Sequence, residues 1–135
     1  MNKVDNFLYE KQTYLIRKAC FRVWNKLGGW HKERIIDKAL TIELRNLGLR
    51  ITDQRSFPIE YRGFSVGSYR PDKIIDDKIL VEVKSKQKLT QSDLTQFWRY
   101  LKTTHFKLGL LINFGNQLQV IRRVYDTARQ NRQQR

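Results

Sequence analysis

The sequence predicts an α/β fold in which a central, mixed β-sheet is flanked by helices. Three observations carry this prediction. Apolar residues recur at helical spacing over residues 6–27 and 31–46, strand-like alternation follows over residues 49–84, and a third helical pattern precedes an apolar stretch at residues 107–114. The predicted order of elements is α-α-β-β-β-α-β-β.

The first two predicted helices each have one apolar side. In the first, the apolar residues fall mostly three or four positions apart, and Gly28-Gly29 is expected to end the helix. They are Leu8, Leu15, Ile16, Ala19, Val23 and Leu27. The second helix has a comparable stripe, and Gly48 is expected to end it. Its members are Ile36, Ala39, Leu40, Leu44 and Leu47.

Glu33 is an acidic residue on the apolar side of the second predicted helix. It lies three residues before Ile36 and seven before Leu40, which places it on the inward stripe. Two interpretations are open. Glu33 is either a first-turn carboxylate stabilised by the helix dipole, or an acidic residue that faces a metal site.

Residues 49–84 show strand patterns separated by turn signals. Residues 50–57 lead past Pro58, which places the first strand at an edge or a bulge, and Arg62-Gly63 predicts a turn. The meander then continues into a hairpin at residues 69–84, the stretch that carries the chemistry of the chain.

In this hairpin, Glu82 and Lys84 share one face of a strand, about 6.6 Å apart along it, because side chains alternate between the faces. Asp76-Asp77 supplies turn chemistry that folds Asp72 back beside Glu82. Two carboxylates and a lysine suit a divalent cation such as Mg²⁺ and the hydrolysis of phosphodiester bonds. The alternative is a solvated hairpin with charges on its open face.

A third helix is expected to begin at a capping box formed by residues 90–93. Its apolar residues occupy one face, namely Leu94, Phe97, Trp98 and Leu101. Gln96 and Tyr100 lie four residues apart and share a neighbouring face, so they can reach one target together or serve as ordinary boundary residues. Residues 107–114 then predict a strand covered on both faces, and residues 118–125 predict a final strand.

Length and charge limit the possible functions. With 135 residues, a single domain is expected over residues 1–125, followed by a basic, solvated tail at residues 126–135. The net charge of +14, from 27 Lys and Arg against 13 Asp and Glu, favours nucleic acid as the binding partner. The alternative partner is an anionic membrane surface.

The sequence contains no uninterrupted apolar span and no signal-peptide core near its start, so a cytoplasmic protein without a membrane segment is expected.

Cys20 is the one cysteine of the chain. It excludes an internal disulfide, a cysteine-held zinc site and a four-cysteine iron–sulfur cluster. Its apolar neighbours Ile16, Ala19 and Val23 predict a small buried residue.

Taken in order, these motifs resemble the PD-(D/E)XK nuclease superfamily and, more narrowly, the small bacterial proteins of the GxxExxY family. The resemblance spans residues 6–125. It rests on Pro71-Asp72, on Glu82-Val83-Lys84 after nine intervening residues, on Gln96 and Tyr100 in one helix, and on the strand-like residues 107–115. It implies a restriction-endonuclease-like core.

The sequence departs from the motif that names the GxxExxY family. Glu33 occupies the place of the glutamate, but Gly29 lies four residues before it rather than three, and Ile36 stands where tyrosine is expected. The carboxylate is kept, and the tyrosine hydroxyl is either absent or supplied from elsewhere.

The resemblance also implies roles for individual residues. Asp72 and Glu82 would ligate Mg²⁺ or Mn²⁺ together with the Val83 carbonyl, and Glu33 would help to hold this metal ion or a second one. Lys84 would position the attacking water and neutralise charge on the phosphorane. Gln96 and Tyr100 would orient Lys84, a water molecule or the nucleic-acid backbone. Many nucleases of this size pair as homodimers by the same resemblance.

The leading hypothesis is a metal-dependent nuclease that cleaves DNA. Trp30, just before Glu33, would either stack on a base or pack as a hydrophobic staple. The basic candidates for nucleic-acid contacts are Arg70, Lys73, Lys86, Lys88 and Arg99. Two rival hypotheses are a module that binds nucleic acid without cutting it and an accessory subunit that binds an acidic protein.

Overall fold

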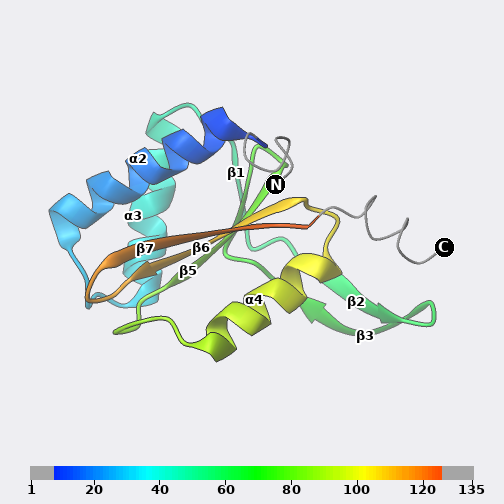
Figure 1. Cartoon of the computed structure of the whole chain (residues 1–135). Helices are drawn as coiled ribbons and strands as arrows, with labels where there is room; N and C mark the ends of the chain where they lie inside the picture. The colour runs from blue at the N-terminus through cyan, green and yellow to red at the C-terminus, as the bar shows by residue number, and fades with distance from the viewer. Residues whose placement is uncertain (1–7, 126–135) are drawn as a thin grey trace.

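The computed structural model describes residues 8–125, and its centre is a five-stranded mixed sheet (Figure 1). The spatial order is β1-β4-β5-β6-β7. The bounds are Ile51–Asp53 for β1, Lys73–Ile75 for β4, Ile79–Lys84 for β5, Leu108–Phe114 for β6 and Leu118–Val124 for β7. The β5–β6 pair is parallel and the other neighbours are antiparallel. The predicted mixed α/β fold is therefore confirmed.

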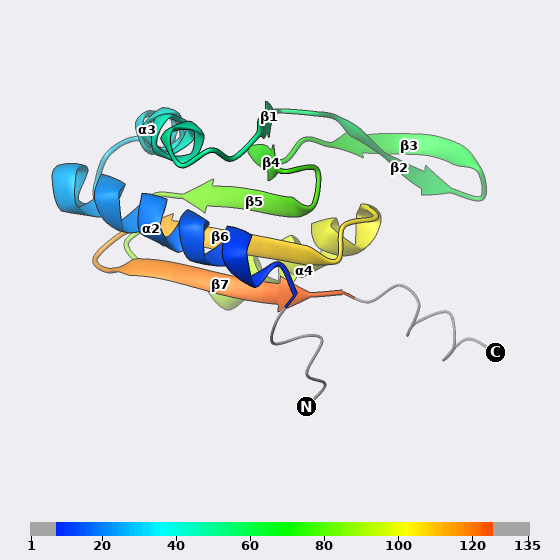
Figure 2. The same cartoon turned by 90° about the horizontal axis from the view of Figure 1, so that it is seen from above.

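Helices cover both faces of this sheet (Figure 2). Helices α2 (Glu10–Leu27) and α3 (Glu33–Asn46) lie on one face, and α4 (Gln91–Thr103) crosses the other while it connects the parallel strands β5 and β6. Strand β6 is buried along its whole length, as its continuous apolar sequence predicts.

The alternation along β5 separates two apolar clusters. Ile79, Val81 and Val83 belong to the cluster shared with α2 and α3, whereas Leu80 packs with Phe97 and other residues of the α4 side. Glu82 and Lys84 have the same parity as Leu80, so their side chains stand on the α4 face of the sheet.

The helix ends follow the predicted signals. Gly28 follows α2 with φ 68°, and Gly48 follows α3 with φ 84°. The side chain of Thr90 and that of Asp93 form the reciprocal capping box at the start of α4. Cys20 is fully buried on α2, and this burial raises the pKa of its thiol to about 12. Its expected place in the core is confirmed.

The stretch between α3 and α4 contains five strands rather than the three predicted. Strands β2 (Phe57–Tyr61) and β3 (Phe64–Tyr69) pair only with each other and form a two-stranded ribbon that extends away from the main sheet (Figures 1 and 2). Pro58 lies in this ribbon, opposite Ser68, and a bulge between Ile59 and Glu60 interrupts the pairing. Both features belong to edge strands, which is why the ribbon is not inserted into the sheet.

Within residues 8–125, none of the helices combines the length and the apolar character that a membrane crossing needs. The predicted tail at residues 126–135 and the predicted helix start at Asn6 lie outside the described residues.

Candidate active site

The β4–β5 hairpin brings the carboxylates of Asp72 and Glu82 together. Lys73 is opposite Val81 in the antiparallel register, so Asp72 arrives beside Glu82. The Asp72 N–H donates to Glu82 Oε1 at 2.9 Å, and the Val83 N–H donates to Asp72 Oδ2 at 2.7 Å. The predicted approach of the two acids is confirmed, and Asp76-Asp77 forms the turn that the sequence predicts, with both residues at positive φ.

These two carboxylates are partly buried and close to each other. Burial raises the pKa of Glu82 to about 7, the neighbouring Asp72 charge adds to the shift, and the Asp72 N–H and Lys84 oppose it. Burial likewise raises the pKa of Asp72, against the Val83 N–H and the charge of Lys84. Two like charges held in this way are stabilised by a cation that binds between them.

Glu33 is the first residue of α3 and is exposed, whereas the buried stripe on its side of the helix begins one turn later at Ile36. Partial burial raises the pKa of Glu33, while the charge of Lys84 lowers it and that of Asp72 raises it. Glu33 therefore lies within electrostatic reach of both.

Two carboxylates, not three, meet at this site. Among residues 8–125, no group of three His, Cys, Asp or Glu side chains is arranged to hold a metal ion. The expectation that Glu33 converges with Asp72 and Glu82 is thus not confirmed. Asp72 and Glu82 form the pair, and Glu33 stands at its rim.

Tyr69 is a residue of this site that the sequence reasoning missed. It ends β3, is buried, and both burial and the adjacent Glu82 carboxylate raise the pKa of its phenol above the usual range. A hydrogen bond between its hydroxyl and the Glu82 carboxylate adds to the rise in the Tyr69 pKa and opposes the rise in the Glu82 pKa. Its position in the sequence, three residues before Asp72 at the end of a strand, is the signal that could have indicated it.

The predicted pair on α4 reaches the site through Tyr69. The rings of Tyr69 and Tyr100 stack with centroids 4.1 Å apart and an interplanar angle of 2°. Gln96 Nε2 donates to the Tyr100 hydroxyl at 3.4 Å. Gln96 is thus linked to Tyr100, and Tyr100 to the tyrosine that faces Glu82. That the pair orients Lys84, a water molecule or the nucleic-acid backbone stays a prediction.

The family model of the PD-(D/E)XK nuclease superfamily matches residues 10–124. The chain belongs to this superfamily. No curated protein and no solved structure matches the chain. The match includes Glu33, Asp72, Glu82, Lys84 and the helix that carries Gln96 and Tyr100.

Lys73 is not available to a nucleic acid, contrary to the prediction. Its side chain is fully buried, and its ammonium forms an ion pair with Asp37 on α3. The reason is alternation, because Lys73 follows Asp72 and so points to the opposite face of the sheet, towards α3. Lys73, the residue after Asp72, therefore links helix α3 to the sheet through its ion pair with Asp37.

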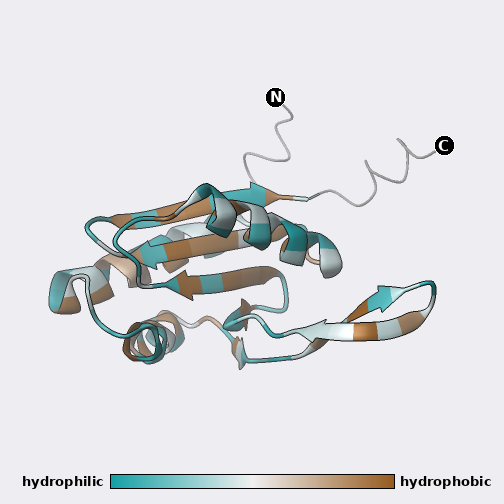
Figure 3. Ribbon diagram, turned by 90° about the horizontal axis from the view of Figure 1, so that it is seen from below, coloured by the Kyte–Doolittle hydropathy of each residue, from teal (hydrophilic) through white to brown (hydrophobic). Residues whose placement is uncertain are grey.

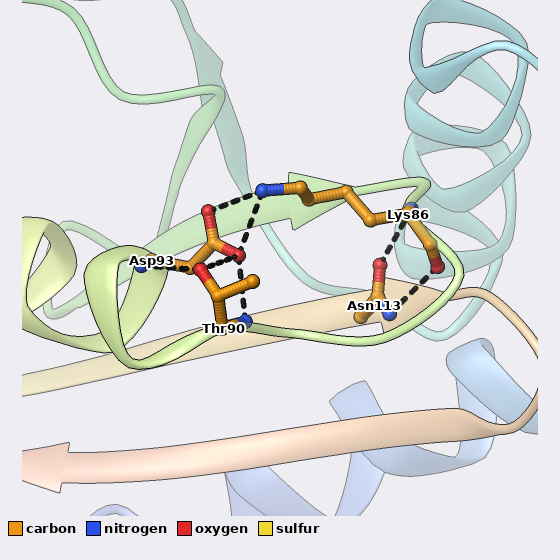
Figure 4. A network of polar contacts seen from close by, with 4 residues as sticks. All are labelled: Lys86, Thr90, Asp93 and Asn113. Carbon is orange, nitrogen blue, oxygen red and sulfur yellow. Dashed lines mark hydrogen bonds and ion pairs between the residues drawn. The ribbon is translucent and has the colours of Figure 1, made fainter.

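Three loops meet at the end of β5, next to Lys84. A Cβ on Gly29 would clash with the Gly115 carbonyl oxygen, and a Cβ on Gly115 would clash with the Lys86 carbonyl oxygen. The fully buried Asn113 accepts from the Lys86 N–H and donates to its carbonyl, both at 3.0 Å (Figure 4). Only glycine fits at positions 29 and 115, because a Cβ at either would overlap a backbone oxygen.

The remaining candidates for nucleic-acid contacts differ in whether their side chains are exposed and free of an ion pair. The Lys86 ammonium is engaged with both carboxylate oxygens of Asp93 at 2.8 Å (Figure 4), and this pair lowers the pKa of Asp93 to about 2. Trp30 is 70% exposed, which removes the alternative of a hydrophobic staple. The other exposed candidates are Arg70, Lys88 and Arg99.

An open hollow of about 550 Å³ lies between β2 and the end of α4, with Phe57, Lys102 and His105 among its lining residues. Neither Asp72 nor Glu82 lines it, so the carboxylate pair and not this hollow defines the candidate site.

Proposed function

We propose that the protein is a divalent-metal-dependent nuclease that hydrolyses phosphodiester bonds of DNA. The observation that carries this proposal is the pairing of Asp72 with Glu82 by the β4–β5 hairpin, with Lys84 on the same face of β5. Membership of the PD-(D/E)XK nuclease superfamily and a net charge of +14 support it. The GxxExxY family remains the narrower assignment that we propose.

The donor set fits Mg²⁺ or Mn²⁺. Two carboxylates whose pKa values are raised by burial, that of Glu82 also by the Asp72 charge and that of Asp72 also by the Asp37 charge, provide hard oxygen ligands and an excess of negative charge. Asp72, Glu82 and the Val83 carbonyl would hold the ion, with Glu33 at the rim. A bound ion would polarise the scissile phosphate and lower the pKa of a bound water.

The side chains of the protein would perform the remaining tasks. Lys84 would donate hydrogen bonds to a non-bridging phosphate oxygen and to the attacking water, which stabilises the charge that develops on the phosphorus centre. Tyr69 would fix the orientation of Glu82, and Tyr100 and Gln96 would hold Tyr69 in place through the ring stack. These three act as positioning residues.

Cleavage of plasmid, linear and branched DNA with Mg²⁺ or Mn²⁺ tests the proposal. We expect Asp72→Asn, Glu82→Gln and Lys84→Ala to lose at least a hundredfold in rate, while the exposed turn variant Lys78→Ala cuts like the parent. Binding of Mn²⁺, followed by calorimetry, is expected to weaken in Asp72→Asn and to persist in Lys84→Ala. The proposal fails if no substrate is cut or if the three variants cut as fast as the parent.

A second candidate is a nucleic-acid-binding protein without hydrolytic activity. One observation favours it, namely that Asp72 and Glu82 each accept a backbone N–H and that, within residues 8–125, they belong to no group of three His, Cys, Asp or Glu side chains that could hold a metal ion. This candidate predicts salt-sensitive DNA binding that needs no divalent metal and survives Glu82→Gln. Absence of cleavage together with such binding would establish it.

A further inference from the structure

The β2–β3 ribbon extends from the candidate site into open space. Its base is fixed by Phe57 and Tyr69, which are buried and directly opposite each other. Beyond them every residue of β3 is exposed, and Figures 1 and 2 show the two strands projecting past the sheet. Among residues 8–125, no other element covers the outer half of this ribbon.

The bulge between Ile59 and Glu60 changes which side chains share a face. Before it, Phe57 and Ile59 lie on the core-facing side with Tyr69. After it, Tyr61 stays on the same face, because β2 alternates without interruption from Phe57 through Ile59, and the bulge on β3 sets Phe64 opposite Tyr61 on that face. The row of Phe57 and Ile59 thus continues with Tyr61 and Phe64 into the projecting part of the ribbon.

The outer end of this row is large and apolar. Tyr61 and Phe64 are 62% and 74% exposed, Val66 at the bulge is 65% exposed, and hydrophobic bands are visible along the projecting ribbon in Figure 3. Arg62 and Gly63 form a tight turn with φ 50° and 83°, which connects the two opposing aromatic residues. Exposed clusters of this kind mark binding surfaces.

The charges around the row identify the partner. The Arg62 guanidinium lies 5.6 Å from the centre of the Tyr61 ring, Arg70 follows the base of the ribbon, and Glu60 is the one acid of residues 57–69. Arg55, on the other side of the base, pairs with Asp77 at 3.4 Å. Aromatic rings beside arginines stack on unpaired bases while the guanidinium groups contact phosphates. A second copy of the chain would bring an equally positive ribbon and be repelled.

We propose that the ribbon binds unpaired nucleotides of the substrate, with Tyr61 and Phe64 stacking on bases. The ribbon leads directly to the candidate site, because Tyr69 ends β3 next to Glu82 and Asp72 follows three residues later. This inference rests on the proposed function in that it names the nucleic acid on which the site acts. The substrate class is one with a single-stranded segment, such as a fork, a flap or a single strand.

Binding of fluorescent oligonucleotides to the full chain, with a chelator present, tests this inference without requiring cleavage. The probes are a single-stranded DNA, a forked DNA, a blunt duplex and a single-stranded RNA. We expect Tyr61→Ser with Phe64→Ser to weaken binding of the single-stranded and forked probes by about tenfold or more, and of the blunt duplex by less than about twofold. The matched control is Ile42→Ser on α3, a residue that is 60% exposed, and it is expected to change neither.

Two further variants separate stacking from simple apolar contact. Tyr61→Phe keeps the ring and is expected to retain binding, whereas Tyr61→Leu keeps only the apolar character and is expected to lose it. Equal losses on duplex and single-stranded probes would overturn the inference, as would unchanged binding. A parent dimer that the double variant converts to a monomer in sedimentation would also overturn it and assign the row to a second copy.

The same measurements distinguish this inference from the proposed function. If the parent cleaves DNA without preferring single-stranded segments, the inference about the ribbon fails and the proposed nuclease function stands. If binding depends on the ribbon but no metal ion supports cleavage, the proposed nuclease function fails and the inference about the ribbon stands.

Discussion

The Glu82 carboxyl group lies where burial and the Asp72 charge both oppose its ionisation, and its pKa is about 7. Asp72 and Glu33 are shifted in the same direction. A folded-state pKa above the ordinary value means that the folded protein retains a proton that the unfolded chain releases. The site is thus strained electrostatically until a cation binds.

We therefore expect the metal-free protein to lose stability as the pH rises. The contribution of Glu82 is fully present below its ordinary pKa of 4.5 and is lost as the pH passes about 7, with a magnitude on the order of 3 kcal/mol. Urea unfolding at pH 5 and pH 8 with a chelator measures this fall, and Glu82→Gln is expected to reduce it. An identical pH dependence in the parent and in Glu82→Gln would contradict the assignment.

The buried ion pair of Lys73 with Asp37 connects strand β4 to helix α3. Its ammonium is buried against Asp37, whose side chain is 21% exposed. Removing one partner of a buried ion pair leaves an uncompensated charge. The pair thus stabilises the attachment of α3, and with it the position of Glu33 at the rim of the site.

Lys73→Met is expected to lower the free energy of unfolding by about 3 kcal/mol. The double variant Lys73→Met with Asp37→Leu is expected to recover part of this loss, because no charge is then left without a partner. Lys88→Met, on an exposed residue, serves as the control in chemical denaturation. Parent-like stability of Lys73→Met would show that the pair contributes nothing.

At the scale of the elements, the end of β5 is fixed by the loop after β6. Asn113 bonds both backbone groups of Lys86, and the Asn116 N–H donates to the Gln87 carbonyl at 3.0 Å. These contacts place Lys84 firmly next to the carboxylates. They require the backbone of residue 115 to approach that of residues 86 and 87 closely.

Gly115→Ala is therefore expected to destabilise the protein by about 3 kcal/mol, since its Cβ would meet backbone oxygen atoms that cannot move aside. The matched control is Gly67→Ala, where a Cβ would lie 3.9 Å from the Ile59 side chain and the expected change is below about 1 kcal/mol. Thermal and urea unfolding of both variants check the contrast. Equal effects would exclude a close-approach role for Gly115.

At the scale of the whole molecule, the net charge of +14 dominates encounters with polyanions. Part of this charge is used internally, because Lys73 pairs with Asp37 and Lys86 with Asp93. Under the proposed function, exposed basic residues would neutralise phosphates. They include Arg70, Lys88 and Arg99.

DNA binding without metal is expected to weaken linearly with the logarithm of the salt concentration, as phosphate contacts require. Lys88→Ala and Arg99→Ala are each expected to lower the salt slope by about one. Lys107→Ala is the control, because Lys107 precedes β6 at the end opposite Lys84. Fluorescence anisotropy over a salt series measures the slopes, and a slope that is the same in all variants would argue against this surface.

The sequence by itself determined the three helices, the last three strands of the central sheet and the carboxylate pair of the site. The alternation along β5 assigned Glu82 and Lys84 to one face, and the Asp76-Asp77 turn brought Asp72 beside Glu82. These features depend on backbone geometry and on residues close together in the chain, so local patterns encode them.

Only the tertiary structure decided which distant side chains became partners. The pairing of Lys73 with Asp37, the stacking of Tyr69 on Tyr100 and the exposed start of α3 at Glu33 depend on how helices are positioned over the sheet. The separation of the β2–β3 ribbon likewise depends on which strands find a place in the sheet. Such contacts join residues far apart in the chain, and register and packing rather than local periodicity determine them.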